Sequence, residues 1–171
     1  MKNLILKRIV AYFLDYLVIM VYAMTLFGVT SIIYGLMDKS LEPMHPLKGN
    51  IVSLITLTIP VFLYFFFTEK SKHQGTIGKK IMKIKVVPNK SKSIFIRNVF
   101  KIIPWELAHI GIHWMVYYEE QGLGLPTWVW ILMVGPQLLV LFYFVTVVVN
   151  KGQSSFYDKI ANTTIRKRSI N

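Results

Sequence analysis

Residues 9–37 read IVAYFLDYLVIMVYAMTLFGVTSIIYGLM, an apolar run whose only charged residue is Asp15. A membrane-spanning helix needs about 20 mostly apolar residues, so this run can cross a bilayer with room to tilt. A cleavable signal peptide has an apolar region of only ~7–15 residues and a small-residue cleavage site soon after it, and this run is too long for that. We therefore interpret residues 9–37 as a retained membrane anchor.

Two further apolar runs are long enough to cross a bilayer. Residues 51–68 are uncharged and lie at the lower length limit for a span, and Pro60 predicts a kink within them. Residues 127–149 are also uncharged, and Trp128 and Trp130 open this run, as is typical of a segment that begins at a membrane interface. Both runs are predicted to be spans.

Residues 94–118 are apolar and aromatic, but charged residues and histidines interrupt them. Two interpretations compete for this stretch: a span whose polar face is turned into the protein, or an interfacial helix followed by a half-span that enters the membrane at Pro104. The distribution of basic residues along the chain favours a full span over about residues 99–118. The interrupting residues are Arg97, Lys101, Glu106, His109 and His113.

The basic residues of the chain gather in three segments. There are 20 Lys and Arg residues against 8 Asp and Glu residues, a net charge of +12, and nearly all the basic residues lie before residue 9, in the loop 69–98 or in the tail 150–171. By the positive-inside rule all three segments are cytoplasmic, so an even number of crossings separates each successive pair. Four spans meet this requirement and place both termini inside.

The composition agrees with a lipid environment. The chain is 54% hydrophobic and 16% charged, whereas soluble domains are about 45–50% apolar and about 25% charged. Without cysteine it has no disulfide framework, iron–sulfur cluster, thiol nucleophile or cysteine-based zinc site. The basic segments carry no nucleic-acid-reading motif, so anionic lipid headgroups and not nucleic acid are the expected partner. The prediction is an all-α integral membrane helical bundle of about four transmembrane helices in one domain, 1–171.

Four short motifs follow one another along the chain. They are KRIVAYFLD at residues 7–15, GTIGKKIMKIKVV at 75–87, IRN at 96–98 and YDKIANTTI at 157–165. Each motif is weak alone, but the ordered set resembles the RDD family of bacterial membrane proteins, and the resemblance covers nearly the whole chain.

The RDD family is named for one arginine and two aspartates, which by this resemblance are Arg8, Asp15 and Asp158. One departure is Tyr157, which stands where relatives often have histidine. The resemblance implies a multi-pass protein of the bacterial cell membrane. It also implies a link to transport, because sodium or potassium exchange for protons has been attributed to some members.

Asp15 needs a partner or a function, because a charged side chain costs about 2.5–3.5 kcal/mol at the middle of a span. Arg8 lies on the same helix face but about 10 Å away along the axis, so we expect each residue to find its partner on another segment. Asp15 is then either a hydrogen-bonded structural carboxylate or a site for a cation or proton. Asp158 is either an exposed carboxylate or the partner of Arg8 at the cytoplasmic mouth.

Glu106, His109 and His113 are predicted to share one helix face. The Glu-x-x-His spacing occurs in the di-metal sites of helical bundles, but the chain lacks the second such motif. Three interpretations remain: a single zinc ion completed by water or Asp15, a proton relay through the histidines, or a polar inner face of the bundle. Together with Asp15, these three residues form the candidate ion or proton site.

Residues 75–80 resemble a phosphate-binding loop only superficially. Such a loop needs a glycine where His73 stands and a serine or threonine where Lys80 stands, so nucleotide binding is rejected. Residues 77–87 fit both helical spacing and strand alternation, and in either form they are expected to lie on the membrane surface. The basic residues of this segment are Lys79, Lys80, Lys83 and Lys85.

Three functions remain for such a protein. The first is the transport of small cations in exchange for protons, with Asp15 and Glu106 as the binding carboxylates; a homo-oligomer is then expected, because four spans are few for alternating access. The second is a non-transporting immunity, secretion-accessory or regulatory partner of another protein. The third is an intramembrane metal-binding protein. We expect no enzyme and no cofactor, since neither a nucleophile nor a second metal motif is visible.

Overall fold

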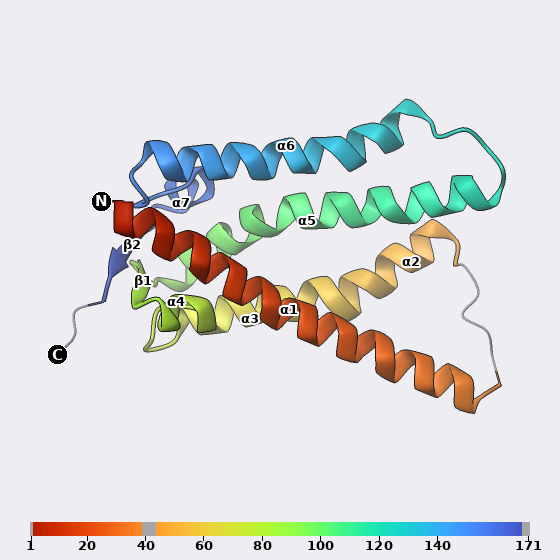
Figure 1. Ribbon diagram of the computed structural model, residues 1–171, viewed down its shortest axis with the longest axis horizontal. Coiled ribbons are helices and arrows are strands. Elements are labelled where there is room, and N and C mark those ends of the chain that lie inside the picture. Colours follow the sequence, from red (N-terminus) through yellow and green to blue (C-terminus); the bar gives the residue numbers. More distant parts are fainter. Residues whose placement is uncertain (1, 39–43, 169–171) are drawn as a thin grey trace.

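The computed structural model describes residues 2–38 and 44–168. The last three residues of the predicted basic tail and residues 39–43 of the loop after the first apolar run lie outside this description. The protein is mostly helical, at 76%. Figure 1 shows long helices that extend from one end of the molecule to the other, and the start of the chain and the last strand lie at the same end.

The long helical segments contain the predicted spans. They are α1 (Lys2–Leu36), a continuous segment made of α2 (Pro46–Ser53), the π-helical turn η1 (Leu54–Thr58) and α3 (Ile59–Lys70), then α5 (Ser91–Glu120) and α6 (Thr127–Val149). Short elements gather at the end that holds the N-terminus (Figure 1). They are α4 (Ile77–Ile81), β1 (Ile84–Val87), α7 (Phe156–Ile160) and β2 (Thr164–Lys167).

Three helical segments of the described chain have the length and apolar composition of membrane spans. They are Leu4–Leu36, Pro46–Lys70 and Thr127–Val149. The predicted fourth span, 99–118, lies inside α5, which has 30 residues and packs along α6. Because it contains several charged residues, α5 is less apolar than these three segments. A total of four crossings therefore stays a prediction.

The all-α prediction was incomplete, because the described chain also contains a two-stranded antiparallel sheet. β1 pairs with β2 so that Val86 lies opposite Ile165 and Ile84 opposite Lys167. Residues 77–87 combine the two patterns that their sequence allows: a helical turn comes first, and a strand follows after Lys83, whose φ is +55°. The helical and alternating patterns therefore belong to successive parts of the segment.

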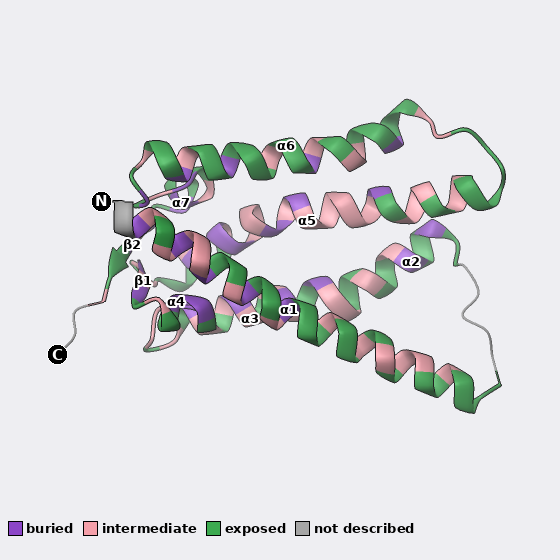
Figure 2. Ribbon diagram, viewed as in Figure 1, coloured by how far each residue is buried: buried purple, intermediate pink, exposed green. Residues whose placement is uncertain are grey.

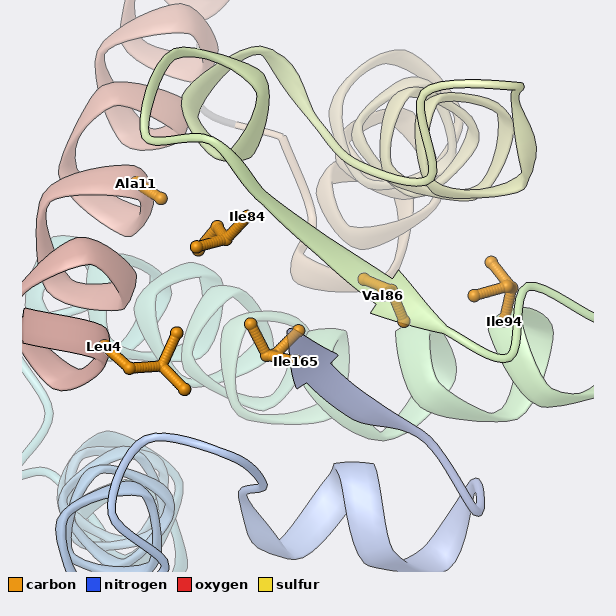
Figure 3. Packing of buried hydrophobic residues seen from close by; sticks show 6 residues of the cluster. All are labelled: Leu4, Ala11, Ile84, Val86, Ile94 and Ile165. Atoms are coloured by element: carbon orange, nitrogen blue, oxygen red, sulfur yellow. The ribbon is translucent and has the colours of Figure 1, made fainter. Parts of the chain in front are cut away.

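A small hydrophobic core fixes this sheet against the helices (Figure 3). Ile84 and Val86 of β1 are fully buried, and alternation places their side chains on one face of the strand. The other side chains of the cluster come from α1, α5 and β2, so four elements share one core. They are Leu4, Ala11, Ile94 and Ile165.

Away from this end, the long helices expose large apolar side chains. Figure 2 shows much of α1 and α6 as exposed, and Phe13, Phe27 and Leu36 of α1 are 66%, 68% and 84% exposed. So large an apolar surface is unusual for a protein in water and is typical of a surface that contacts lipid. The exposed apolar surface therefore supports a membrane location.

Pro60 and Pro104 lie inside these helices, where each leaves a carbonyl without its usual donor, because proline has no N–H. Pro60 cannot donate to the carbonyl of Thr56, which instead accepts a hydrogen bond from the Tyr22 hydroxyl at 2.5 Å. A kink was predicted at Pro60, and at the same place the helix contains the wider π-helical turn η1. A tyrosine thus replaces the missing backbone donor from a neighbouring helix.

The same replacement occurs in α5, and it gives a testable prediction. Pro104 cannot donate to the carbonyl of Phe100, and the Tyr143 hydroxyl of α6 donates to it at 3.0 Å. We expect Tyr143→Phe to lower the free energy of unfolding by about 1–3 kcal/mol, since it leaves a part-buried carbonyl without a donor. Unfolding by SDS in mixed micelles, followed by tryptophan fluorescence, measures the loss.

The control is the same substitution in a Pro104→Ala background. There the amide of residue 104 can donate to Phe100, so Tyr143→Phe is expected to cost much less. Equal losses in the two backgrounds would show that the ring contacts of Tyr143, and not its hydroxyl, carry the effect.

Candidate functional site

The Asp15 carboxylate is buried, and its partners come from two other segments. The Tyr64 hydroxyl of α3 donates to Oδ1 at 3.0 Å, and the amide of Gly78 donates to the same oxygen at 2.9 Å. The Thr76 hydroxyl, at the start of α4, donates to Oδ2 at 2.6 Å. The expectation that Asp15 finds its partners away from α1 agrees with this geometry, and three donors hold both of its oxygens.

Arg8 and Asp158 form an ion pair of 2.9 Å between Nη2 and Oδ2. Asp158 is fully buried, so the interpretation of an exposed carboxylate was wrong and the pair with Arg8 is the arrangement found. Arg8 also donates from Nη1 to the carbonyl of Gly152 at 3.1 Å. The first helix is thereby fastened to the loop and short helix that follow α6.

Asp158 owes its position to α7. It is the third residue of that helix, and it forms a capping box with Ser155, whose hydroxyl accepts from the Asp158 amide while the carboxylate accepts from the Ser155 amide at 2.8 Å. Burial by itself raises the pKa of this carboxyl, but the guanidinium groups of Arg97 and Arg8 outweigh it and hold the pKa well below its usual range. Asp158 is therefore ionised at neutral pH.

The Arg8–Asp158 pair is one end of a chain of buried ion pairs. Arg97 of α5 donates from Nε to Asp158 at 2.7 Å and from Nη1 to Glu69 at 2.6 Å. Glu69, at the end of α3, also accepts from Lys79 of α4 at 2.7 Å. Charges of opposite sign thus alternate through five elements, and we call these five residues the ion-pair chain.

Sequence reasoning missed the middle of the ion-pair chain. Arg97 was noted only as part of the IRN motif and as a charge that interrupts an apolar stretch, and Glu69 was given no role. Lys79 was predicted to lie on the membrane surface, but it is only 8% exposed because it pairs with Glu69. Lys80 and Lys83 are exposed, as a surface segment requires. The place of the IRN motif in the ordered set was a signal for Arg97, but no local pattern pointed to its partners.

The predicted stripe of acid and histidines on α5 does not converge on one point. Glu106 accepts a hydrogen bond from the Thr58 hydroxyl at 2.6 Å, and His109 Nδ1 lies 3.1 Å from the carbonyl one turn earlier. His113 packs against Gly49 of α2, where an added Cβ would come within 2.7 Å of its ring. In the described ranges no three His, Cys, Asp or Glu residues are grouped to hold a metal ion.

A cavity of about 620 Å³ lies between α1, α3, α5 and α6. Most of its wall is apolar, but Asp15, Lys101, His109 and Gln137 line it. The Lys101 ammonium lies 3.0 Å from the centroid of the Phe65 ring, and it forms none of the ion pairs found in the described chain. The cavity therefore combines one hydrogen-bonded carboxylate with one ammonium group that has no carboxylate in contact.

The structure brings together part of the predicted ion site. Asp15 and His109 line the same cavity, whereas Glu106 and His113 are not among its lining residues. The cavity lining contains Lys101 instead. From the sequence this residue was noted only as a charge that interrupts an apolar stretch.

Apolar helices that carry buried charges at one end of the molecule define an integral membrane protein. The chain belongs to the RDD family, whose sequence pattern matches residues 3–162; RDD proteins are membrane proteins. The resemblance drawn from the ordered motifs is thus confirmed, and the matched range includes Arg8, Asp15 and Asp158. No curated protein and no solved structure matches the sequence.

Proposed function

We propose that this RDD protein exchanges small cations for protons through the cavity that contains Asp15 and Lys101. The observation that carries the proposal is the placement of a carboxylate and an unpaired ammonium in one cavity between membrane helices. Charged residues within spans are expensive and commonly mark ion or proton pathways.

The oxygen atoms around Asp15 suit a small hard cation. The hydroxyls of Tyr64 and Thr76 each lie within hydrogen-bonding distance of the Asp15 carboxylate, and oxygen ligands of these kinds bind such cations. A cation that enters beside Asp15 adds one positive charge, and a proton that leaves Lys101 removes one. Exchange therefore leaves the net charge of the low-dielectric cavity unchanged, which favours coupling of the two movements.

The orientation we propose places both termini in the cytoplasm of a bacterial cell. The start of α1, the loop before α5 and the segment after α6 lie at one end of the molecule (Figure 1), and these are the basic segments. With α5 as a fourth crossing, the arrangement satisfies the positive-inside rule. Because four crossings are few for alternating access, the transporting unit would be a homo-oligomer.

Proteoliposomes that contain the purified protein and a trapped pH indicator test this function. We expect a sodium or potassium gradient to drive proton movement with the native protein, and Asp15→Asn and Lys101→Met each to abolish it. Glu106→Gln is the matched control, since it changes an α5 carboxylate outside the cavity lining, and flux should persist. Size-exclusion profiles show whether each variant is folded. Proton flux that survives both cavity substitutions would contradict the proposal.

A second candidate is a membrane protein that binds a partner and does not transport. It is favoured by the three donors that already satisfy both Asp15 oxygens, as expected of a structural carboxylate. In that case native proteoliposomes show no flux above protein-free vesicles, and Asp15→Asn lowers the amount of folded protein in the membrane.

A further inference from the structure

A second pocket, of about 410 Å³, lies at the end of the molecule where the N-terminus is found. Its walls come from the first turn of α1, the loop after α6 and strand β2, and they include Leu4, Lys151, Gln153, Arg166 and Lys167. We propose that this pocket binds the phosphodiester headgroup of an anionic phospholipid. The proposal is independent of whether the protein transports ions.

The charge of the lining residues selects an anion. Lys151, Arg166 and Lys167 are exposed cations, and among the described residues no carboxylate lines the pocket. In addition, Arg166 lies directly opposite Lys85 in the sheet register, and like charges in that position destabilise a strand pair. A bound phosphate would offset this repulsion as well as the charge of the pocket.

The backbone contributes donors to the same pocket. The Arg168 amide donates to the Lys83 carbonyl at 2.9 Å, and the Ile165 amide donates to the Gln153 carbonyl on the opposite side of β2 at 2.7 Å. Because successive amides of a strand alternate in direction, the Lys167 amide points to the Gln153 side, which is the edge that borders the pocket. Leu4 lies in the first turn of α1, where amides lack helical acceptors and the helix dipole is positive.

The pocket wall is held in place before any ligand binds. Gly152, between two lining residues, has a φ of +83° and approaches α1 so closely that an added Cβ would lie 2.9 Å from the Ile5 amide nitrogen. Arg8 fixes the same residue through its carbonyl. Pre-organised donors lower the cost of ordering the site when a ligand binds.

The depth of the pocket favours a lipid over free phosphate as the source of the anion. Leu4 begins one candidate span, and Lys151 follows the end of another, Val149. The pocket thus lies where two apolar helices leave the hydrocarbon, at the level of the headgroups. Val149, which is 71% exposed and lies two residues before the lining residue Lys151, offers apolar surface for an acyl chain.

Native mass spectrometry of the detergent-purified protein tests the proposal with phosphatidylglycerol and phosphatidylcholine as probes. We expect preferential retention of phosphatidylglycerol by the native chain. A variant with Lys151→Gln, Arg166→Gln and Lys167→Gln should bind it roughly 100-fold more weakly, since each basic residue near an anionic lipid contributes about 1 kcal/mol.

The control variant carries the same loss of charge outside the pocket, as Lys80→Gln, Lys83→Gln and Lys92→Gln, three exposed lysines. It should keep its phosphatidylglycerol affinity within about threefold, because it removes long-range attraction only. Equal losses in the two triple variants would overturn the proposal in favour of a diffuse surface attraction.

A second arm separates lipid from soluble phosphate. Glycerol 3-phosphate at millimolar concentration should leave the bound phosphatidylglycerol in place, because it lacks the acyl chains that contact the apolar surface. If it displaces the lipid and binds with equal affinity, the pocket is a site for a soluble phosphate ester and the lipid assignment is wrong.

Discussion

Glu69→Gln will lower the free energy of unfolding by about 3–5 kcal/mol, although glutamine and glutamate have nearly the same size. Glu69 is fully buried and neutralises both Arg97 and Lys79, and removal of one partner from a buried ion pair leaves uncompensated charge. After the substitution the ion-pair chain would hold three cations, including Arg8, and a single carboxylate, Asp158. SDS unfolding in mixed micelles measures the loss.

Two comparisons separate charge balance from simple loss of contacts. Glu119→Gln makes the same chemical change at the exposed end of α5 and should alter stability by no more than about 0.5 kcal/mol. Arg97→Met removes more contacts than Glu69→Gln, yet it leaves the Arg8–Asp158 and Lys79–Glu69 pairs intact. We therefore expect Arg97→Met to cost less than Glu69→Gln.

The double variant completes this test. With Glu69→Gln already present, Arg97→Met restores the wild-type excess of one positive charge in the ion-pair chain, so the double variant should be more stable than Glu69→Gln alone. If the two losses simply add, charge balance does not govern the stability of this core.

The apolar helices were predictable because lipid imposes a strong compositional signal. The run 127–149 can be recognised as a span from its own composition, without knowledge of the segments that it contacts. The structure contains it as α6 with the same bounds. The Arg8–Asp158 contact was also predictable in outline, because placing both termini on one side allows the two residues to meet. Both inferences rest on the lipid environment and on the membrane topology. The composition and the distribution of charge in a single sequence indicate both.

The partners of polar residues were less predictable, because helical spacing gives the face of a side chain but not what lies opposite. Glu106, His109 and His113 were grouped by spacing alone, yet α5 has different neighbours along its length. Glu106 meets Thr58, while His113 meets Gly49. A shared face of one helix therefore does not make a shared site.

Contacts between distant segments explain the other failures. The strands 84–87 and 164–167 lie far apart in the sequence and yet pair, and neither strand's sequence indicates its partner. Lys79 was assigned to the membrane surface with the rest of residues 77–87, but it forms an ion pair with Glu69 from the end of α3. Such long-range pairs are outside the reach of local periodicity.

Gly78→Ala will separate α4 from α1 and lower the free energy of unfolding by about 4 kcal/mol. A Cβ at this position would lie 2.1 Å from the Ala11 carbonyl oxygen and 3.0 Å from Asp15 Oδ1. The first neighbour is helix backbone and cannot rotate away, so α4 must move. Movement breaks the hydrogen bonds that Gly78 and Thr76 donate to Asp15, which adds the penalty of an unsatisfied buried carboxylate to that of overpacking.

Gly28→Ala is the matched control, because a Cβ at that position of α1 meets nothing within 4 Å and alanine favours a helix over glycine. Its stability should equal or exceed that of the native chain in the same SDS titration. Detachment of α4 also exposes Lys79, which is buried in the native chain, so Gly78→Ala should speed tryptic cleavage there while Gly28→Ala does not. A Gly78→Ala protein that unfolds within about 1 kcal/mol of the native chain would show that α4 is not held against α1 by this close contact.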